Sequence, residues 1–139
     1  MTMTSTNSAI DKTLRTGWIL LAVSLPLGVT LEALHGFKVQ AYVSSEMRRE
    51  MWRLAHAHGT LLGILCLVFS VVADKQLVDP ARASIAKLVR WGAVLMPIGF
   101  FAGGVLNSEG DPSLGVVIVP IGAALLVVAL VRCAFNRAR

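Results

Sequence analysis

Residues 54–73 read LAHAHGTLLGILCLVFSVVA, a run without a single Asp, Glu, Lys or Arg. A helix of this length is about 30 Å long, which matches the hydrocarbon thickness of a bilayer. Lipid offers no partner for an unpaired backbone group, so a spanning segment must be a helix or part of a closed barrel. This stretch therefore predicts a transmembrane helix whose first turns carry two histidines, His56 and His58.

Three further stretches are similarly long and apolar and hold one charged residue each, and the predicted spans cover about residues 17–36, 54–73, 88–106 and 114–132. Four spans are too few for a barrel. Of the 139 residues, 55% are hydrophobic and only 15% are charged, and the mean hydropathy is +0.70. The sequence predicts an all-α integral membrane four-helix bundle that forms a single domain. The polar residues 1–10 are expected to be a disordered tail.

The orientation follows from the basic residues. With four spans, both termini and the middle loop lie on one side of the membrane, and that side holds nine of the 13 Lys and Arg residues. The other side holds Lys38, Arg48, Arg49 and Arg53. Because basic loops stay in the cytoplasm, we expect cytoplasmic N- and C-termini and a multi-pass protein of the inner (plasma) membrane.

Helix ends and partners can also be predicted. Ser44 or Ser45 is expected to cap a helix that starts before the second span. Tryptophans 18, 52 and 91 are expected to anchor span ends at the membrane interface. No basic stripe with interleaved aromatic residues predicts a nucleic-acid partner. Glycine-lined helix faces indicate contacts with further copies of the chain or with a larger membrane complex, in addition to the lipid bilayer.

Small and polar residues gather on one face of each span when successive residues are placed about 100° apart. The aligned sets are Gly17, Ser24, Gly28, Glu32 and His35; Arg49, Trp52, Arg53, His56, Gly59, Thr60 and Gly63; Gly92, Met96, Gly99, Gly103 and Asn107; and Gly115, Gly122, Ala129 and Cys133. Such faces are expected to point into the bundle. His58 lies about 200° around the helix from His56, among leucines, and is expected to face elsewhere.

The chain's three histidines are expected to converge near the extracytoplasmic surface with several carboxylates. Ionisable groups that border a membrane span are costly and indicate a functional site. Imidazole and carboxylate together suit transition metals, and histidines on facing helices suit haem iron. The predicted metal ligands are Glu32, His35 and His56, and the predicted cofactor-binding residues are His35, His56 and His58. Asn107, Glu109 and Asp111 are expected nearby.

The run LAHAHG at residues 54–59 resembles the His-x-His helix in the membrane subunit of haem-copper oxidases. In that family the two histidines face two different haems near the outer side of the bilayer. The resemblance implies that His56 and His58 serve different cofactors. The family's further copper-ligand histidines have no counterparts, because His35 is the only other histidine. A complete oxidase site and proton pumping are therefore not implied.

Together these patterns predict a small membrane redox protein that binds a haem or a transition metal, copper or iron, through histidines near the extracytoplasmic face. Two alternatives stay open. One is a structural or accessory subunit of a larger membrane complex; the other is a small oligomeric transporter or proton pathway that uses Glu32 and the histidines. The residues do not decide between an enzyme and an electron carrier.

Overall fold

The computed structural model describes residues 3–108 and 110–136. The element order is α1 (Met3–Gly36), α2 (Gln40–Val43), α3 (Glu46–Gln76), α4 (Asp79–Gly104), the 3-10 turn η1 (Leu114–Val117) and α5 (Ile118–Phe135). The helices long and apolar enough to cross a membrane are Thr6–Gly36, Glu46–Gln76, Ala81–Gly104 and Leu114–Phe135. The predicted all-α fold with four such helices is confirmed.

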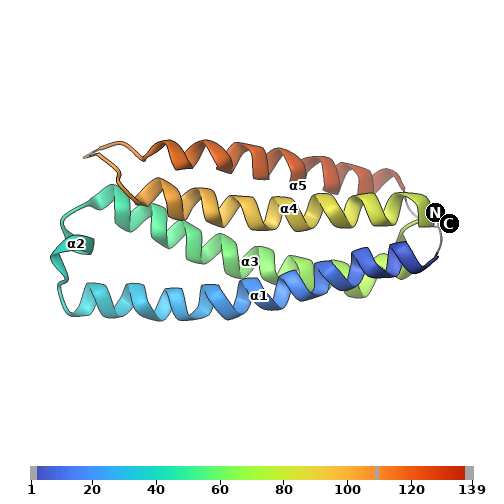
Figure 1. The fold of residues 1–139 in the computed structure, drawn as a ribbon, viewed down its shortest axis with the longest axis horizontal. Coiled ribbons are helices and arrows are strands. Elements are labelled where there is room, and N and C mark those ends of the chain that lie inside the picture. Colours follow the sequence, from blue (N-terminus) through green and yellow to red (C-terminus); the bar gives the residue numbers. More distant parts are fainter. Residues whose placement is uncertain (1–2, 109, 137–139) are drawn as a thin grey trace.

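The four long helices lie side by side in the order α1, α3, α4 and α5, each antiparallel to the next (Figure 1). The first residues of α1 and the last residues of α5 lie at the end of the bundle where α3 turns into α4. We call this the terminal end of the bundle. The opposite end, which carries α2 and η1, is the α2 end. α3 packs between α1 and α4, and α1 also contacts α4. Among the described residues, the backbone of α5 approaches only α4 and η1. The bundle is therefore open on the side of α5.

Helix ends are fixed by local chemistry. Ser45 caps α3 by accepting a hydrogen bond from the backbone N–H of Arg48 at 3.2 Å, as one of the two predicted caps should. At the α2 end, Lys38 and Leu106 have φ values of 53° and 54° and turn the chain away from the axes of α1 and α4. These turns lead into α2 and into the segment of residues 107, 108 and 110–113 at the α2 end.

The N-terminal segment differs from the expected disordered tail. From Met3 onwards it continues α1, and the side chains of Thr6, Ala9 and Ile10 are buried. The hydroxyl of Thr13 donates to the carbonyls of Ala9 at 2.9 Å and of Ala86 on α4 at 3.2 Å. The prediction missed this contact because a polar segment of low hydropathy gives no sign of a partner distant in sequence. Residues 1 and 2 of the expected tail lie outside the described residues.

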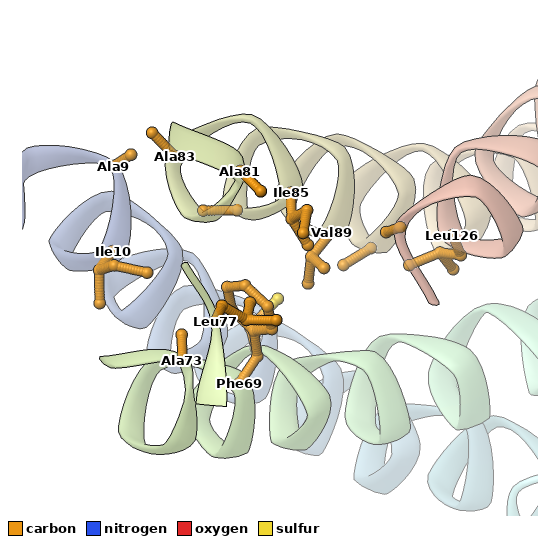
Figure 2. Packing of buried hydrophobic residues seen from close by; sticks show 14 of the residues in the cluster. Ala9, Ile10, Phe69, Ala73, Leu77, Ala81, Ala83, Ile85, Val89 and Leu126 are labelled. Carbon is orange, nitrogen blue, oxygen red and sulfur yellow. The ribbon is translucent and has the colours of Figure 1, made fainter. Parts of the chain in front are cut away.

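A cluster of buried apolar side chains lies toward the terminal end (Figure 2). All four long helices contribute, with Ile10 from α1, Phe69 from α3, Ile85 from α4 and Leu126 from α5. The remaining buried members are mostly alanines, which let the helix axes come close. This cluster fixes α1 to the helical hairpin of α3 and α4.

Two glycine pairs mark close helix crossings. A Cβ atom added to Gly17 on α1 would lie 2.8 Å from the carbonyl oxygen of Gly63 on α3. A Cβ atom added to Gly92 on α4 would lie 2.8 Å from the carbonyl oxygen of Gly122 on α5. The prediction that these glycines face into the bundle is confirmed, since all four are buried.

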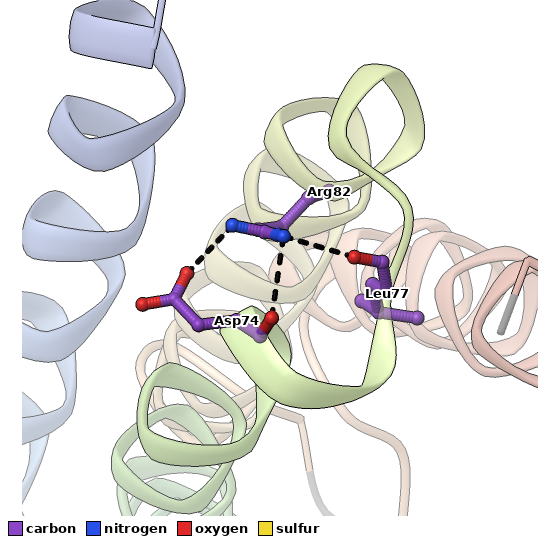
Figure 3. Close-up of polar contacts among 3 residues, drawn as sticks. All are labelled: Asp74, Leu77 and Arg82. Carbon is purple, nitrogen blue, oxygen red and sulfur yellow. Dashed lines mark hydrogen bonds and ion pairs between the residues drawn. The ribbon is translucent and has the colours of Figure 1, made fainter. Parts of the chain in front are cut away.

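Arg82 holds the turn between α3 and α4 (Figure 3). Its guanidinium donates to the carboxylate of Asp74 at 2.8 Å and to the carbonyls of Asp74 at 3.3 Å and Leu77 at 3.0 Å. The Arg82 side chain is only 15% exposed, whereas that of Asp74 is 60% exposed. One cation therefore satisfies carbonyls that the end of α3 leaves without helical partners.

Replacing Arg82 by alanine is expected to lower the free energy of unfolding by about 1–3 kcal/mol, because charge-assisted bonds to two carbonyls are lost. Replacing Asp74 by alanine is expected to cost less than about 1 kcal/mol, because an exposed ion pair is weak. Titration with SDS in mixed micelles, followed by circular dichroism, measures both. Equal losses for the two variants would contradict the dominance of the carbonyl contacts.

Candidate functional site

The candidate site lies on the first turns of α3, near the α2 end. The helix starts with charged residues at 46–53, and its apolar part follows. His56 and His58 lie three and five residues beyond the exposed Arg53, about 4.5 Å and 7.5 Å further along the helix axis. Both side chains are half-buried. α3 thus presents two histidines just inside its apolar section.

His56 faces α1. Its Nδ1 lies 2.7 Å from the backbone carbonyl oxygen of Ser24, and its ring packs on Gly28 one turn further along α1. The ring fits because residue 28 has no side chain: an added Cβ atom would lie 2.8 Å from Nδ1 and 2.9 Å from Nε2. The absence of a side chain at Gly28 therefore leaves the space that the His56 imidazole occupies.

His58 faces α4. Its Nδ1 lies 2.9 Å from the carbonyl oxygen of Leu54, one turn earlier on its own helix. Its ring packs against Phe100, with ring centroids 4.6 Å apart and planes tilted by 33°. The two histidines thus contact different helices, in agreement with the opposite directions predicted from the helical wheel.

The hydrogen bonds determine which nitrogen of each imidazole carries the proton and which keeps a lone pair. A carbonyl oxygen only accepts, so Nδ1 must carry the proton in both rings, and in the neutral form Nε2 keeps its lone pair. In the described part of the chain no protein group bonds either Nε2, and neither atom is fully buried. This is the arrangement of metal-ligating histidines, whose second nitrogen donates to a carbonyl or carboxylate.

Glu32 and His35 do not join His56. Both side chains are exposed on α1, and the described residues contain no group of three His, Cys, Asp or Glu side chains placed to hold one metal ion. His35 follows Gly28 by seven residues, about 10 Å along the axis of α1. The predicted inward stripe is correct for Gly17 and Ser24, which are buried, but not for these two residues.

The physical reason is the winding of the helices around each other. The buried positions of α1 recur every seven residues, at Ile10, Gly17, Ser24 and Leu31. Seven residues fall about 20° short of two full turns of a straight helix, so the buried stripe drifts around the helix. A face drawn with fixed 100° steps therefore reaches Glu32, which lies about 100° around the helix from the buried Leu31. His35 shares the face of Leu31 but lies in the last turn of α1, where its side chain is exposed.

The outer end of α4 contributes less than expected. The amide nitrogen of Asn107 donates to the Ser45 hydroxyl at 2.9 Å, which ties the chain after α4 to the start of α3. Asp111 is exposed, and Glu109 lies outside the described residues. Asn107 therefore has a bracing role in this structure.

An aromatic cluster that the sequence did not reveal closes the α2 end. Trp52 stacks between Tyr42 and Phe101, at centroid distances of 6.0 Å and 5.3 Å, and its indole N–H donates to the Phe101 carbonyl at 3.1 Å. Trp52 therefore joins α2, α3 and α4, whereas Trp18 and Trp91 are 60% and 54% exposed; the role of the three tryptophans as interface anchors stays a prediction. Aromatic residues near three helix ends were the available signal, but their pairing needed the fold.

Arginines complete this cluster. Arg48 donates to the carbonyl of Gly104 at 3.1 Å and to that of Ala41, and it lies over the Trp52 ring. Arg49 donates to the Val43 carbonyl. Both side chains thus fasten α2 and the end of α4 to α3. Arg53 stays exposed at the rim of the site.

No protein-family model, curated protein or solved structure matches this chain. The similarity of residues 54–59 to the His-x-His helix therefore rests on those six residues and on the geometry of their two histidines.

Proposed function

We propose that this chain is a small redox protein of the inner membrane that binds a haem or a transition metal through His56. The observation that carries the proposal is the 2.7 Å contact between Nδ1 of His56 and the Ser24 carbonyl. It holds the ring between two helices and leaves Nε2 as a lone-pair donor. Iron or copper at this position would supply one-electron chemistry.

The placement of charged residues supports a membrane location. On α3, Arg53 and Asp74 are exposed and lie 21 residues apart, about 31 Å along the axis, which is the thickness of a hydrocarbon core. The excess of Lys and Arg at the terminal end favours a cytoplasmic position for that end. His56 then lies a few ångströms inside the extracytoplasmic boundary. Water is scarce there and competes little with the imidazole for a metal ion.

Glu32 and His35 remain the predicted further ligands. They lie on α1 at the same end of the bundle, outside the contact between His56 and Gly28. Replacing His35 by alanine tests whether His35 contributes to cofactor binding, separately from His56.

The deciding measurement is a reduced-minus-oxidised visible spectrum of the purified protein, with elemental analysis for iron and copper. We expect a stoichiometric cofactor that His56→Ala removes and His58→Ala retains, because the two rings face different helices. Circular dichroism confirms that each variant is folded. A colourless, metal-free and fully helical wild-type protein would overturn the proposal.

The open side of α5 favours a second candidate, an accessory subunit of a larger membrane complex. An apolar groove of about 270 Å³ runs between α3 and α5 at the terminal end, lined by residues such as Phe69, Leu130 and Cys133. Such a surface suits a further transmembrane helix. Stoichiometric co-purification of another membrane protein after mild solubilisation, together with the absence of any cofactor, would favour this candidate.

A further inference from the structure

We propose that Nε2 of His58 is a binding point for the hydroxyl group of an apolar phenol that reaches it from within the bilayer. The inference rests on the membrane placement in the proposed function, but it does not require that a cofactor be bound at His56. The argument uses the polarity of the nitrogen, its surroundings and its depth.

The contact of Nδ1 with the Leu54 carbonyl determines that Nε2 of His58 acts as a hydrogen-bond acceptor. Because Nδ1 donates to that carbonyl at 2.9 Å, Nε2 of the neutral ring is an acceptor and requires a donor. In the described chain no protein donor reaches it, and the atom is not fully buried. An unpaired acceptor in an apolar medium is costly, so a ligand that supplies an O–H group gains a hydrogen bond there without competition from water.

The surroundings are apolar and aromatic. The imidazole packs on Phe100 from α4, and the neighbouring positions on the same face of α3 are Leu54, Leu61, Leu62 and Leu65. Leu61 is 63% exposed and offers the adjacent surface to a ligand. One polar atom beside an apolar surface suits a molecule that has one polar group and an apolar body.

The depth distinguishes a phenol from a lipid headgroup. His58 lies five residues inside Arg53, about 7.5 Å along α3, and so below the level at which headgroup hydroxyls lie. A phenol can partition to this depth, because its hydroxyl is attached to an apolar ring and not to a charged or zwitterionic headgroup. The phenolic O–H is also neutral, so its entry leaves no unpaired charge in hydrocarbon.

The experiment compares 4-decylphenol with 4-decylanisole, its methyl ether, which differs in lacking the O–H donor. Retention of each tritium-labelled probe is measured on lipid nanodiscs with and without the full-length protein. We expect saturable retention of the phenol and about tenfold weaker retention of the ether, the effect of one hydrogen bond in an apolar site. Equal retention of both probes by the wild-type protein overturns the proposal, and this comparison depends on no variant.

Two variants assign the site. His58→Phe keeps a ring on Phe100 without an acceptor and is expected to weaken phenol retention about tenfold, to the level of the ether. Val68→Phe adds the same side chain at an exposed position deeper on α3 and should leave retention unchanged. If His58→Phe binds the phenol as the wild type does, or if it removes a cofactor seen in the visible spectrum, the assignment is wrong. Absence of any cofactor from the wild type leaves this measurement of binding intact.

Discussion

Replacing Gly28 by valine is expected to abolish cofactor binding while the helices stay folded. A Cβ atom at this position would lie 2.8 Å from Nδ1 of His56, so the imidazole must leave its place. The ring then loses its bond to the Ser24 carbonyl, and Nε2 moves with it. Because losing an orienting partner alone weakens metal binding about 10–100-fold, displacing the ligand ring should cost at least about a hundredfold.

The measurement is the cofactor content of the purified variant, from its visible spectrum and its metal content, beside its circular dichroism. The clash involves the end of a side chain that can rotate away, so the contact between α1 and α3 should survive. Gly36→Val is the matched control, since a Cβ atom there has no neighbour within 4 Å. Full cofactor content in Gly28→Val would show that the position of the His56 ring is irrelevant to binding.

Replacing Gly92 by valine is expected to detach α5 from the bundle. A Cβ atom at residue 92 would lie 2.8 Å from the Gly122 carbonyl and 2.6 Å from the Leu126 side chain, and a backbone oxygen cannot rotate away. α4 is the one long helix whose backbone α5 approaches in the described structure, so the change disturbs the main attachment of α5. Overpacking of this kind costs about 1–3 kcal/mol or more.

Two readouts follow this change. The free energy of unfolding in SDS titrations should fall, and hydrogen exchange should become faster in α5 than in α3. Ala124→Val serves as the control, because residue 124 is exposed on α5 and the added methyl groups meet only lipid or detergent. An unchanged stability of Gly92→Val would mean that α5 is held by contacts other than this crossing.

Much of the fold could be predicted because it depends on local properties. The length and low charge of residues 54–73 already require a helix in lipid, and the same reasoning holds for the other three long helices. The cap at Ser45 and the inward-facing Gly92 and Gly122 were also predictable, since each follows from a short-range pattern. The helical start of α1 was not, because its stability comes from α4 rather than from its own hydropathy.

The candidate site was predictable in part. Neighbours in one helix have a fixed angular relation, so the divergence of His56 and His58 followed from their spacing. The expected contact of His56 with Glu32 and His35 depended instead on the rotation of α1 about its own axis relative to α3. The spacing of residues along α1 does not determine this rotation. Small angular differences accumulate over several turns, and the structure leaves both residues exposed.

The sequence by itself determined four apolar helices, their antiparallel order and the presence of histidines at one end, because long apolar runs with almost no charge favour helices that can cross a membrane. Only the tertiary structure decided which carbonyl orients each imidazole, that Gly28 makes room for His56, and that Trp52 closes the α2 end between Tyr42 and Phe101. These contacts join residues far apart in the chain, and they depend on helix rotation and axial register, which no local pattern fixes.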